Sequence, residues 1–64
     1  MTSELHTEVI GDYVYTVVAC PTDRFPDRVG INWLTVLGDR QGTVGGIFLN
    51  QDAAMQQLRR ISGA

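Results

Sequence analysis

The chain of 64 residues has seven acidic and five basic side chains, a net charge of −2, one cysteine and one histidine. This length allows one small domain (residues 1–64), and a lone cysteine excludes an internal disulfide. One cysteine and one histidine also fall short of the roughly four ligands of a structural zinc site, and the charge lacks the basic footprint typical of nucleic-acid-binding proteins.

The sequence shows no pattern typical of a membrane span or a signal peptide. No apolar run approaches the roughly 20 residues of a transmembrane helix. The start, MTSELHTE, has neither the basic nor the apolar region of a signal peptide. We therefore expect a soluble, cytoplasmic protein with no membrane partner, in which Cys20 stays reduced.

The first part of the chain changes from polar to β-like. Residues 1–7 are polar, and we expect them to be flexible. Residues 8–20, EVIGDYVYTVVAC, are rich in the β-branched and aromatic types that suit strands. Gly11 and Asp12 interrupt this run, either as a tight hairpin turn or as a bulge within one long strand. We favour the bulge, because residues 7–10 are short for an independent strand.

A loop, two strands and a turn follow. Residues 21–30, PTDRFPDRVG, contain two prolines and a glycine and predict a loop, which Phe25 is expected to anchor to the core. Residues 31–38, INWLTVLG, predict the second strand. Residues 38–42, GDRQG, predict a turn, and residues 43–49, TVGGIFL, predict a third strand weakened by its double glycine.

The register of the last two strands remains open at this stage. Gly42 suits a left-handed position in the turn. If residues 39–42 form the turn, Trp33 lies opposite Phe48. A slip of one residue would place Trp33 opposite Ile47 and exchange the two faces of the third strand.

The helix is the clearest element. Asn50 is a good N-cap, Asp52 lies in the first turn, and two arginines lie in the last turn, where a helix favours positive charge. The apolar stripe consists of Ala54, Met55, Leu58 and Ile61, and Gly63 follows as a C-cap. The predicted class is therefore α+β: a three-stranded antiparallel β-meander followed by one C-terminal helix packed on one sheet face, in the order β-β-β-α.

One helix covers one face of such a sheet, yet both faces carry apolar residues. We expect an aliphatic set to lie under the helix, namely Val14, Val18, Leu34, Val36 and Ile47. The aromatic set, with a neighbouring threonine, then lies on the open face: Tyr13, Tyr15, Trp33, Thr35 and Phe48. Three interpretations of this aromatic set compete: core residues, an interface with another protein or a second copy, and a stacking platform for nucleic acid.

No pattern in the chain indicates catalysis. Cys20 is most simply a small buried hydrophobic residue, because His6 is the one imidazole base and lies in the polar N-terminal segment. The glycines of GDRQGTVGG lack the lysine and the following helix of a phosphate-binding loop. We therefore expect no enzyme activity, no catalytic or metal-binding residues and no cofactor.

A resemblance supports an alternative. Residues 42–58, GTVGGIFLNQDAAMQQL, resemble the end of AP2-type and phage-integrase amino-terminal DNA-binding domains. The resemblance implies a β-β-β-α order and nucleic-acid binding through the sheet, although the predicted strands here carry no basic residue. The leading prediction is a small non-enzymatic protein-interaction module. Its size suits a bacterial or phage accessory protein that inhibits or adapts a larger host complex, such as a defence system.

Overall fold

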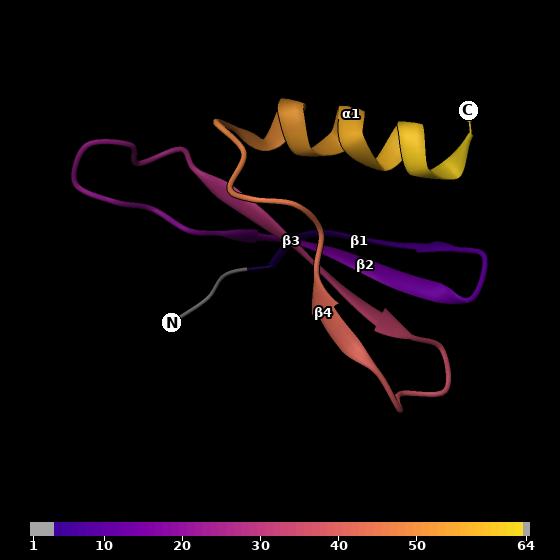
Figure 1. The fold of residues 1–64 in the computed structure, drawn as a ribbon. Helices are drawn as coiled ribbons and strands as arrows, with labels where there is room; N and C mark the ends of the chain where they lie inside the picture. The colour runs from indigo at the N-terminus through magenta and orange to yellow at the C-terminus, as the bar shows by residue number, and fades with distance from the viewer. Residues whose placement is uncertain (1–3, 64) are drawn as a thin grey trace.

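The computed structural model describes residues 4–63, which form a four-stranded antiparallel sheet and one helix. The sheet has the order β1-β2-β3-β4, and α1 lies along one of its faces (Figure 1). This confirms the α+β class with a C-terminal helix packed on the sheet, and adds a short fourth strand. The elements are β1 (Glu4–Ile10), β2 (Tyr13–Ala19), β3 (Val29–Thr35), β4 (Gln41–Thr43) and α1 (Gln51–Ser62).

The segment predicted as the first strand forms two strands, β1 and β2. Gly11 and Asp12 form a tight turn that pairs Ile10 with Tyr13, so the favoured bulge at this point is wrong and the hairpin alternative is correct. Gly11 adopts a φ of 62°, which glycine reaches without steric cost. A bulge does occur, but between Glu4 and His6. Of the segment predicted to be flexible, residues 4–7 belong to β1, and residues 1–3 lie outside the described residues.

The turn between β3 and β4 closes earlier than either predicted register allows. The backbone N–H of Thr35 donates to the Arg40 carbonyl (3.0 Å), and the Thr35 hydroxyl donates to Asp39 Oδ1 (2.6 Å). Gly38, and not Gly42, takes the left-handed conformation, with a φ of 78°. Trp33 therefore pairs with Gly42, and both predicted partners of Trp33 are wrong.

The segment predicted as a third strand is mostly irregular. β4 covers three residues and ends at Thr43, and Gly45 then turns the chain with a φ of 59°. Phe48 returns to the sheet in an isolated bridge with Val29, where the two residues exchange backbone hydrogen bonds of 3.1 and 2.8 Å. The double glycine thus marks the point at which the chain leaves the sheet edge for the helix.

The helix confirms its predicted signals. The Asn50 side chain accepts a hydrogen bond from the Ala53 N–H (2.9 Å), and Gly63 ends the helix in the left-handed conformation. Ala54 and Leu58, in the middle of the apolar stripe, are buried at 0% and 1% exposure. Burial of this stripe against the sheet stabilises a helix that would be marginal alone at this length.

The helix covers the opposite face from the one predicted. Tyr15 pairs with Trp33 and Val17 with Ile31, and this face builds the core against α1. The two-residue period of the strands places the rings of Tyr15 and Trp33 on the same side as Val17 and Ile31, between sheet and helix. The core residues are Tyr15, Val17, Val29, Ile31, Ala54 and Leu58, with Ile10, Trp33, Val44, Phe48, Met55 and Ile61 packed against them.

The aliphatic set therefore does not pack under α1. Val14, Val18 and Leu34 lie on the open face, where they alternate with the core residues of β2 and β3 and share the face with Thr16 and Asn32. Val36 and Ile47 lie outside the strands, and more than half of each is exposed. The open face therefore carries apolar side chains, including Leu34 at 40% exposure, beside the polar Thr16 and Asn32.

The long loop before β3 is stabilised locally and not by an apolar anchor. Phe25 is 44% exposed, so the prediction that it reaches the core is wrong. The Arg28 guanidinium lies 4.1 Å from the centroid of the Phe25 ring, a cation–π contact, and the Thr22 hydroxyl accepts from the Phe25 N–H (3.1 Å).

Candidate protein-binding site

The predicted contact residues other than Phe48 gather at one end of the sheet. Tyr13, Tyr15, Trp33 and Thr35 line a hollow of about 480 Å³ together with Arg40. We call this site the aromatic hollow. It lies on the helix side of the sheet, whereas the prediction placed the aromatic set on the open side.

Strand pairing assembles the aromatic hollow. Tyr13 is paired with Thr35, and Tyr15 with Trp33, so the four side chains share one face of two neighbouring strands. The rings of Tyr13 and Trp33 meet edge to face, with centroids 5.7 Å apart and an interplanar angle of 86°. The rings of Tyr13 and Tyr15 are 6.2 Å apart. Such contacts hold aromatic rings in fixed orientations.

Trp33 has a further support in β4. The indole lies over Gly42, so close that a Cβ atom at this position would be 2.7 Å from Cε2 and Cζ2. Gly42 has no positive φ; its lack of a side chain makes room for the ring. Close approach of another group to the backbone is one reason for a glycine within a strand. The tryptophan is thereby fixed from below by the backbone and from the side by Tyr13.

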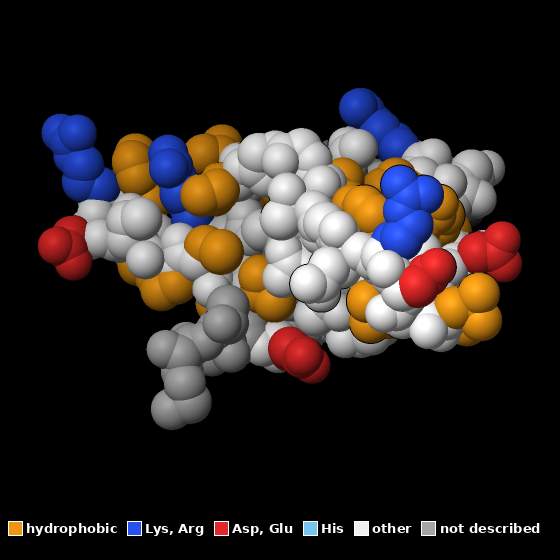
Figure 2. All heavy atoms as spheres, turned by 60° about the horizontal axis from the view of Figure 1, so that its bottom comes forward, with side chains coloured by type: hydrophobic (Ala, Val, Ile, Leu, Met, Phe, Trp, Pro, Cys, Tyr) orange, Lys and Arg blue, Asp and Glu red, His pale blue; other side chains and the backbone are white. Residues whose placement is uncertain are grey.

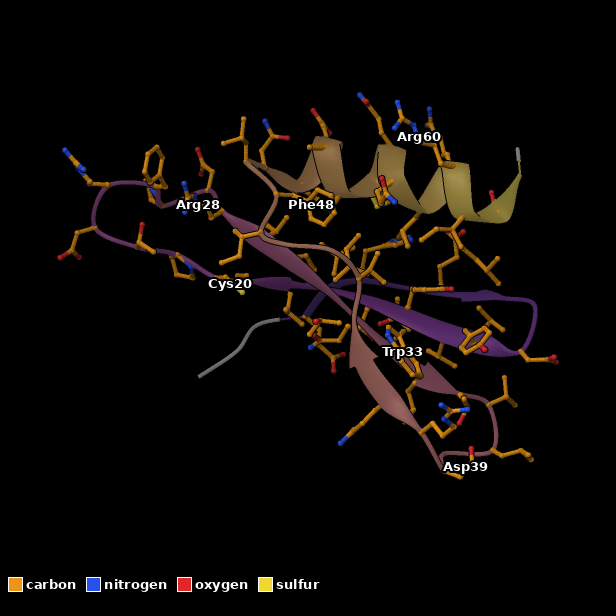
Figure 3. All side chains as sticks on the ribbon, viewed as in Figure 1. Cys20, Arg28, Trp33, Asp39, Phe48 and Arg60 are labelled. Atoms are coloured by element: carbon orange, nitrogen blue, oxygen red, sulfur yellow. The ribbon has the colours of Figure 1, made fainter. Side chains whose placement is uncertain are left out.

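The twist of the sheet leaves this end uncovered. In the described residues, α1 packs against β1, β2 and β3 and makes no contact with β4. Figure 1 shows the end of β3 and β4 turning away from the helix, as the right-handed twist of strands requires. In Figure 3, Phe48 lies beside α1, whereas Trp33 lies away from the helix next to β4. Phe48 is therefore a core residue, separate from the aromatic hollow.

Exposure rises from the floor of the hollow to its rim. Tyr15 is 9% exposed and forms the floor, and Tyr13 is 42% exposed at the side. Beside it, the turn that follows β3 carries two exposed apolar residues, Val36 and Leu37, the second of which is 90% exposed. An apolar rim of this kind around aromatic rings is available for contact with another molecule.

Charged side chains of both signs lie around the aromatic hollow. Arg40 lines the hollow, and Asp12 and Asp39 lie on its outer side, next to the exposed turn. Figure 2 shows this end on the right, where an arginine lies among hydrophobic side chains and acidic side chains lie beside them. Within residues 4–63 the Arg40 guanidinium forms no ion pair, and the Asp39 carboxylate accepts from the Thr35 hydroxyl. Arg40 is thus free to bind a partner's acceptor.

Sequence reasoning missed Arg40 and Gly42. The sequence signal for both was Thr35 followed four residues later by Asp39. A threonine hydroxyl can hydrogen-bond to the turn that follows it, and this bond fixes the position at which the hairpin closes. With the turn closed at that point, Arg40 falls opposite Thr35 and Gly42 opposite Trp33. Both then belong to the aromatic face.

The imidazole of His6 and the thiol of Cys20 lie apart in the described part of the chain. His6 Nε2 contacts Glu8 Oε1 at 3.1 Å. Cys20 is a free, half-buried thiol three residues beyond Val17, the strand partner of His6, which separates the two by roughly 10 Å along the sheet. No group of three or more metal-ligating side chains occurs between residues 4 and 63.

Comparison with known proteins adds no relative. No protein-family model, no curated protein and no solved structure matches the chain. The resemblance of residues 42–58 to the AP2-type and integrase domains thus rests on the sequence pattern alone. In the described residues, no helix combines the length and the apolar character needed to cross a membrane.

Proposed function

We propose that this protein is a small non-enzymatic module that binds another protein through the aromatic hollow. The observation that supports the proposal is the composition of the hollow: one tryptophan, two tyrosines and an arginine on one uncovered end of the sheet. These are the residue types that dominate the binding energy of protein interfaces, because each combines a large contact area with a polar group. The module acts in the cytoplasm, where its single thiol stays reduced.

The mode of action follows from the size of the domain. A domain of 64 residues that binds through the aromatic hollow at one end would cover a patch on a larger protein. By covering this patch, it inhibits or adapts that protein. The rigid support of Trp33 by Gly42 and Tyr13 favours binding, since side chains that are already ordered lose little entropy when a partner arrives.

Nucleic-acid binding has less support. The strands carry the aromatic rings on the side of α1, and the open face from β1 to β4 carries no arginine. A stacking platform requires exposed rings beside positive charge. In the aromatic hollow Arg40 is accompanied by Asp12 and Asp39.

The proposal is tested by affinity capture from a lysate of the source cells, followed by titration of the purified partner. Tyr13→Ala and Arg40→Ala remove exposed parts of the hollow. Leu49→Ala and Arg59→Ala are matched controls, because Leu49 is 68% exposed and Arg59 is exposed on α1, both away from the hollow. We expect Tyr13→Ala to weaken binding by about 2 kcal/mol, roughly thirtyfold, and the controls to bind normally.

Two results would overturn the proposal. One is a partner that binds the Tyr13→Ala and Arg40→Ala variants as tightly as the wild type. The other is specific binding to DNA or RNA that falls steeply as salt is raised, the signature of phosphate contacts. Circular dichroism of each variant establishes that the fold is retained.

A further inference from the structure

β1 is an edge strand with unused backbone groups. Next to the two ends of β2, the Asp12 carbonyl accepts from the Val36 N–H (2.9 Å) and the Cys20 N–H donates to the Arg28 carbonyl (2.8 Å). The even-numbered positions of β2 therefore bond toward β3. The backbone groups of successive residues in a strand point to opposite sides, so the odd-numbered residues of β2 bond toward β1. The β1 residues opposite them are even-numbered. The N–H and C=O groups of Thr7 and Val9 therefore point away from the sheet.

Part of this edge is regular enough to pair with another strand. β1 has seven residues, whereas β4, the strand at the opposite edge, has three. β1 contains no proline and no lysine, the residues that most often block edge-to-edge pairing. The bulge between Glu4 and His6 disturbs its first residues and leaves the part from His6 to Ile10 regular.

The regular part of β1 is complementary to itself. His6 and Glu8 flank Thr7 and lie on the helix side of the sheet, 33% and 40% exposed. In an antiparallel pairing centred on Thr7, each Thr7 faces Thr7 of the second strand, each His6 faces Glu8, and each Glu8 faces His6. An imidazole opposite a carboxylate forms a favourable polar pair between strands, and two carboxylates in directly opposed positions destabilise the pairing. Pairing about Glu8 or about His6 would instead oppose two like groups.

We propose that two copies of this chain associate through β1, antiparallel and centred on Thr7, to form a continuous eight-stranded sheet. The twofold axis is perpendicular to the sheet, so both helices lie on the same side. The Thr7 backbones exchange their free N–H and C=O groups, and the imidazole of each His6 lies beside the carboxylate of Glu8 in the other copy. The contact is small, so the dimer should form in a concentration-dependent way.

The dimer goes beyond the proposed function and leaves the aromatic hollow open. The hollow is built by β2, β3 and the turn before β4, and not by the edge strand. Two hollows would face the same side of one assembly, and a partner with two binding sites would gain affinity from their linkage. Dimerisation and partner binding are therefore disrupted by different substitutions, and either proposal can fail alone.

The first test measures solution mass by sedimentation over a dilution series. For the wild type we expect a shift from 7.1 kDa toward twice that value as concentration rises. Thr7→Pro removes an outward N–H while preserving the bonds of β1 to β2, so it should remain at 7.1 kDa. Gln51→Pro is the control, because the first position of a helix tolerates proline, and it should dimerise normally.

The second test uses complementary charges and does not depend on a proline being tolerated. His6→Glu gives a chain with two carboxylates flanking Thr7, and Glu8→His gives a chain with two imidazoles. In slightly acidic buffer, where imidazoles are charged, each variant alone should stay monomeric. An equal mixture should form a heterodimer, because every opposed pair is then again of opposite charge. The pair within one chain is lost in both variants, so it cannot explain recovery on mixing.

Three results would contradict the proposal. A constant wild-type mass of 7.1 kDa across the dilution series would exclude the dimer. A Thr7→Pro protein that is folded by circular dichroism and dimerises like the wild type would show that β1 is not the interface. A mixture of His6→Glu and Glu8→His chains that remains monomeric would show that the charge pairing centred on Thr7 is wrong.

Discussion

Trp33 is the residue on which the aromatic hollow depends. Its indole lies against the backbone of Gly42 and against the Tyr13 ring, at the one end of the helix-side face that α1 does not cover. The glycine leaves just enough room for the ring, and the ring in turn covers the short β4 strand. The position and mobility of this side chain should therefore respond to changes at Gly42 that leave the core untouched.

Gly42→Ala tests this arrangement. The new Cβ would lie 2.7 Å from two indole atoms, so the ring must move or β4 must separate from β3. We expect a loss of stability of about 1–3 kcal/mol and a red shift of the Trp33 emission. Gly46→Ala is the matched control, because its Cβ would meet no atom within 4 Å and its φ is not positive. Equal melting and emission of the two variants would refute the packing of Trp33 on Gly42.

At the scale of elements, the buried core is formed by α1 against β2 and β3. Leu58 is 1% exposed and lies in the centre of the helix face that meets Tyr15, Val17 and Ile31. Leu58→Ala should cost about 2–5 kcal/mol, a large part of the stability of so small a domain. Gln56→Ala, on the exposed side of the same helix, should melt like the wild type. Thermal unfolding followed by circular dichroism compares them, and equal midpoints would mean that the helix face is misassigned.

The start of the helix gives a second prediction for this element. The Asn50 side chain satisfies the Ala53 N–H, so Asn50→Ala should lower the free energy of unfolding by about 0.5–2 kcal/mol. Gln51→Ala is the control, because the Gln51 side chain lies next to the cap, is exposed and makes no capping bond. Urea unfolding of both proteins measures the difference. A loss in Gln51→Ala as large as that in Asn50→Ala would show that the cap is not responsible.

At the scale of the whole molecule, local sequence signals predicted where the helix lies better than which face of the sheet the helix covers. The helix, with Asn50 and Gly63 at its ends, follows from side chains that act within one turn of themselves. The face that meets the helix depends on packing between distant segments, and aromatic or aliphatic character alone does not decide it. The partner of Trp33 depends on where the Thr35 hydroxyl closes the turn, and a one-residue error there reverses a whole strand.

The candidate site was predictable in part for the same reason. Tyr13, Tyr15, Trp33 and Thr35 share a face by simple alternation on two neighbouring strands, so their grouping followed from the sequence. Phe48 was grouped with them through a wrong register, and Arg40 was missed for the same cause. That α1 leaves this end uncovered depends on the twist of the sheet, which no residue pattern reports.

The central claim is that a protein partner binds over Trp33 in the aromatic hollow. The chain contains one tryptophan, so quenching of its fluorescence by acrylamide measures access to this site directly. In the free protein the half-buried indole should be quenched readily, and in the complex with the purified partner quenching should fall severalfold. The matched complex of the Leu49→Ala variant should show the same protection. A partner that binds tightly while Trp33 remains as accessible as in the free protein would contradict the claim.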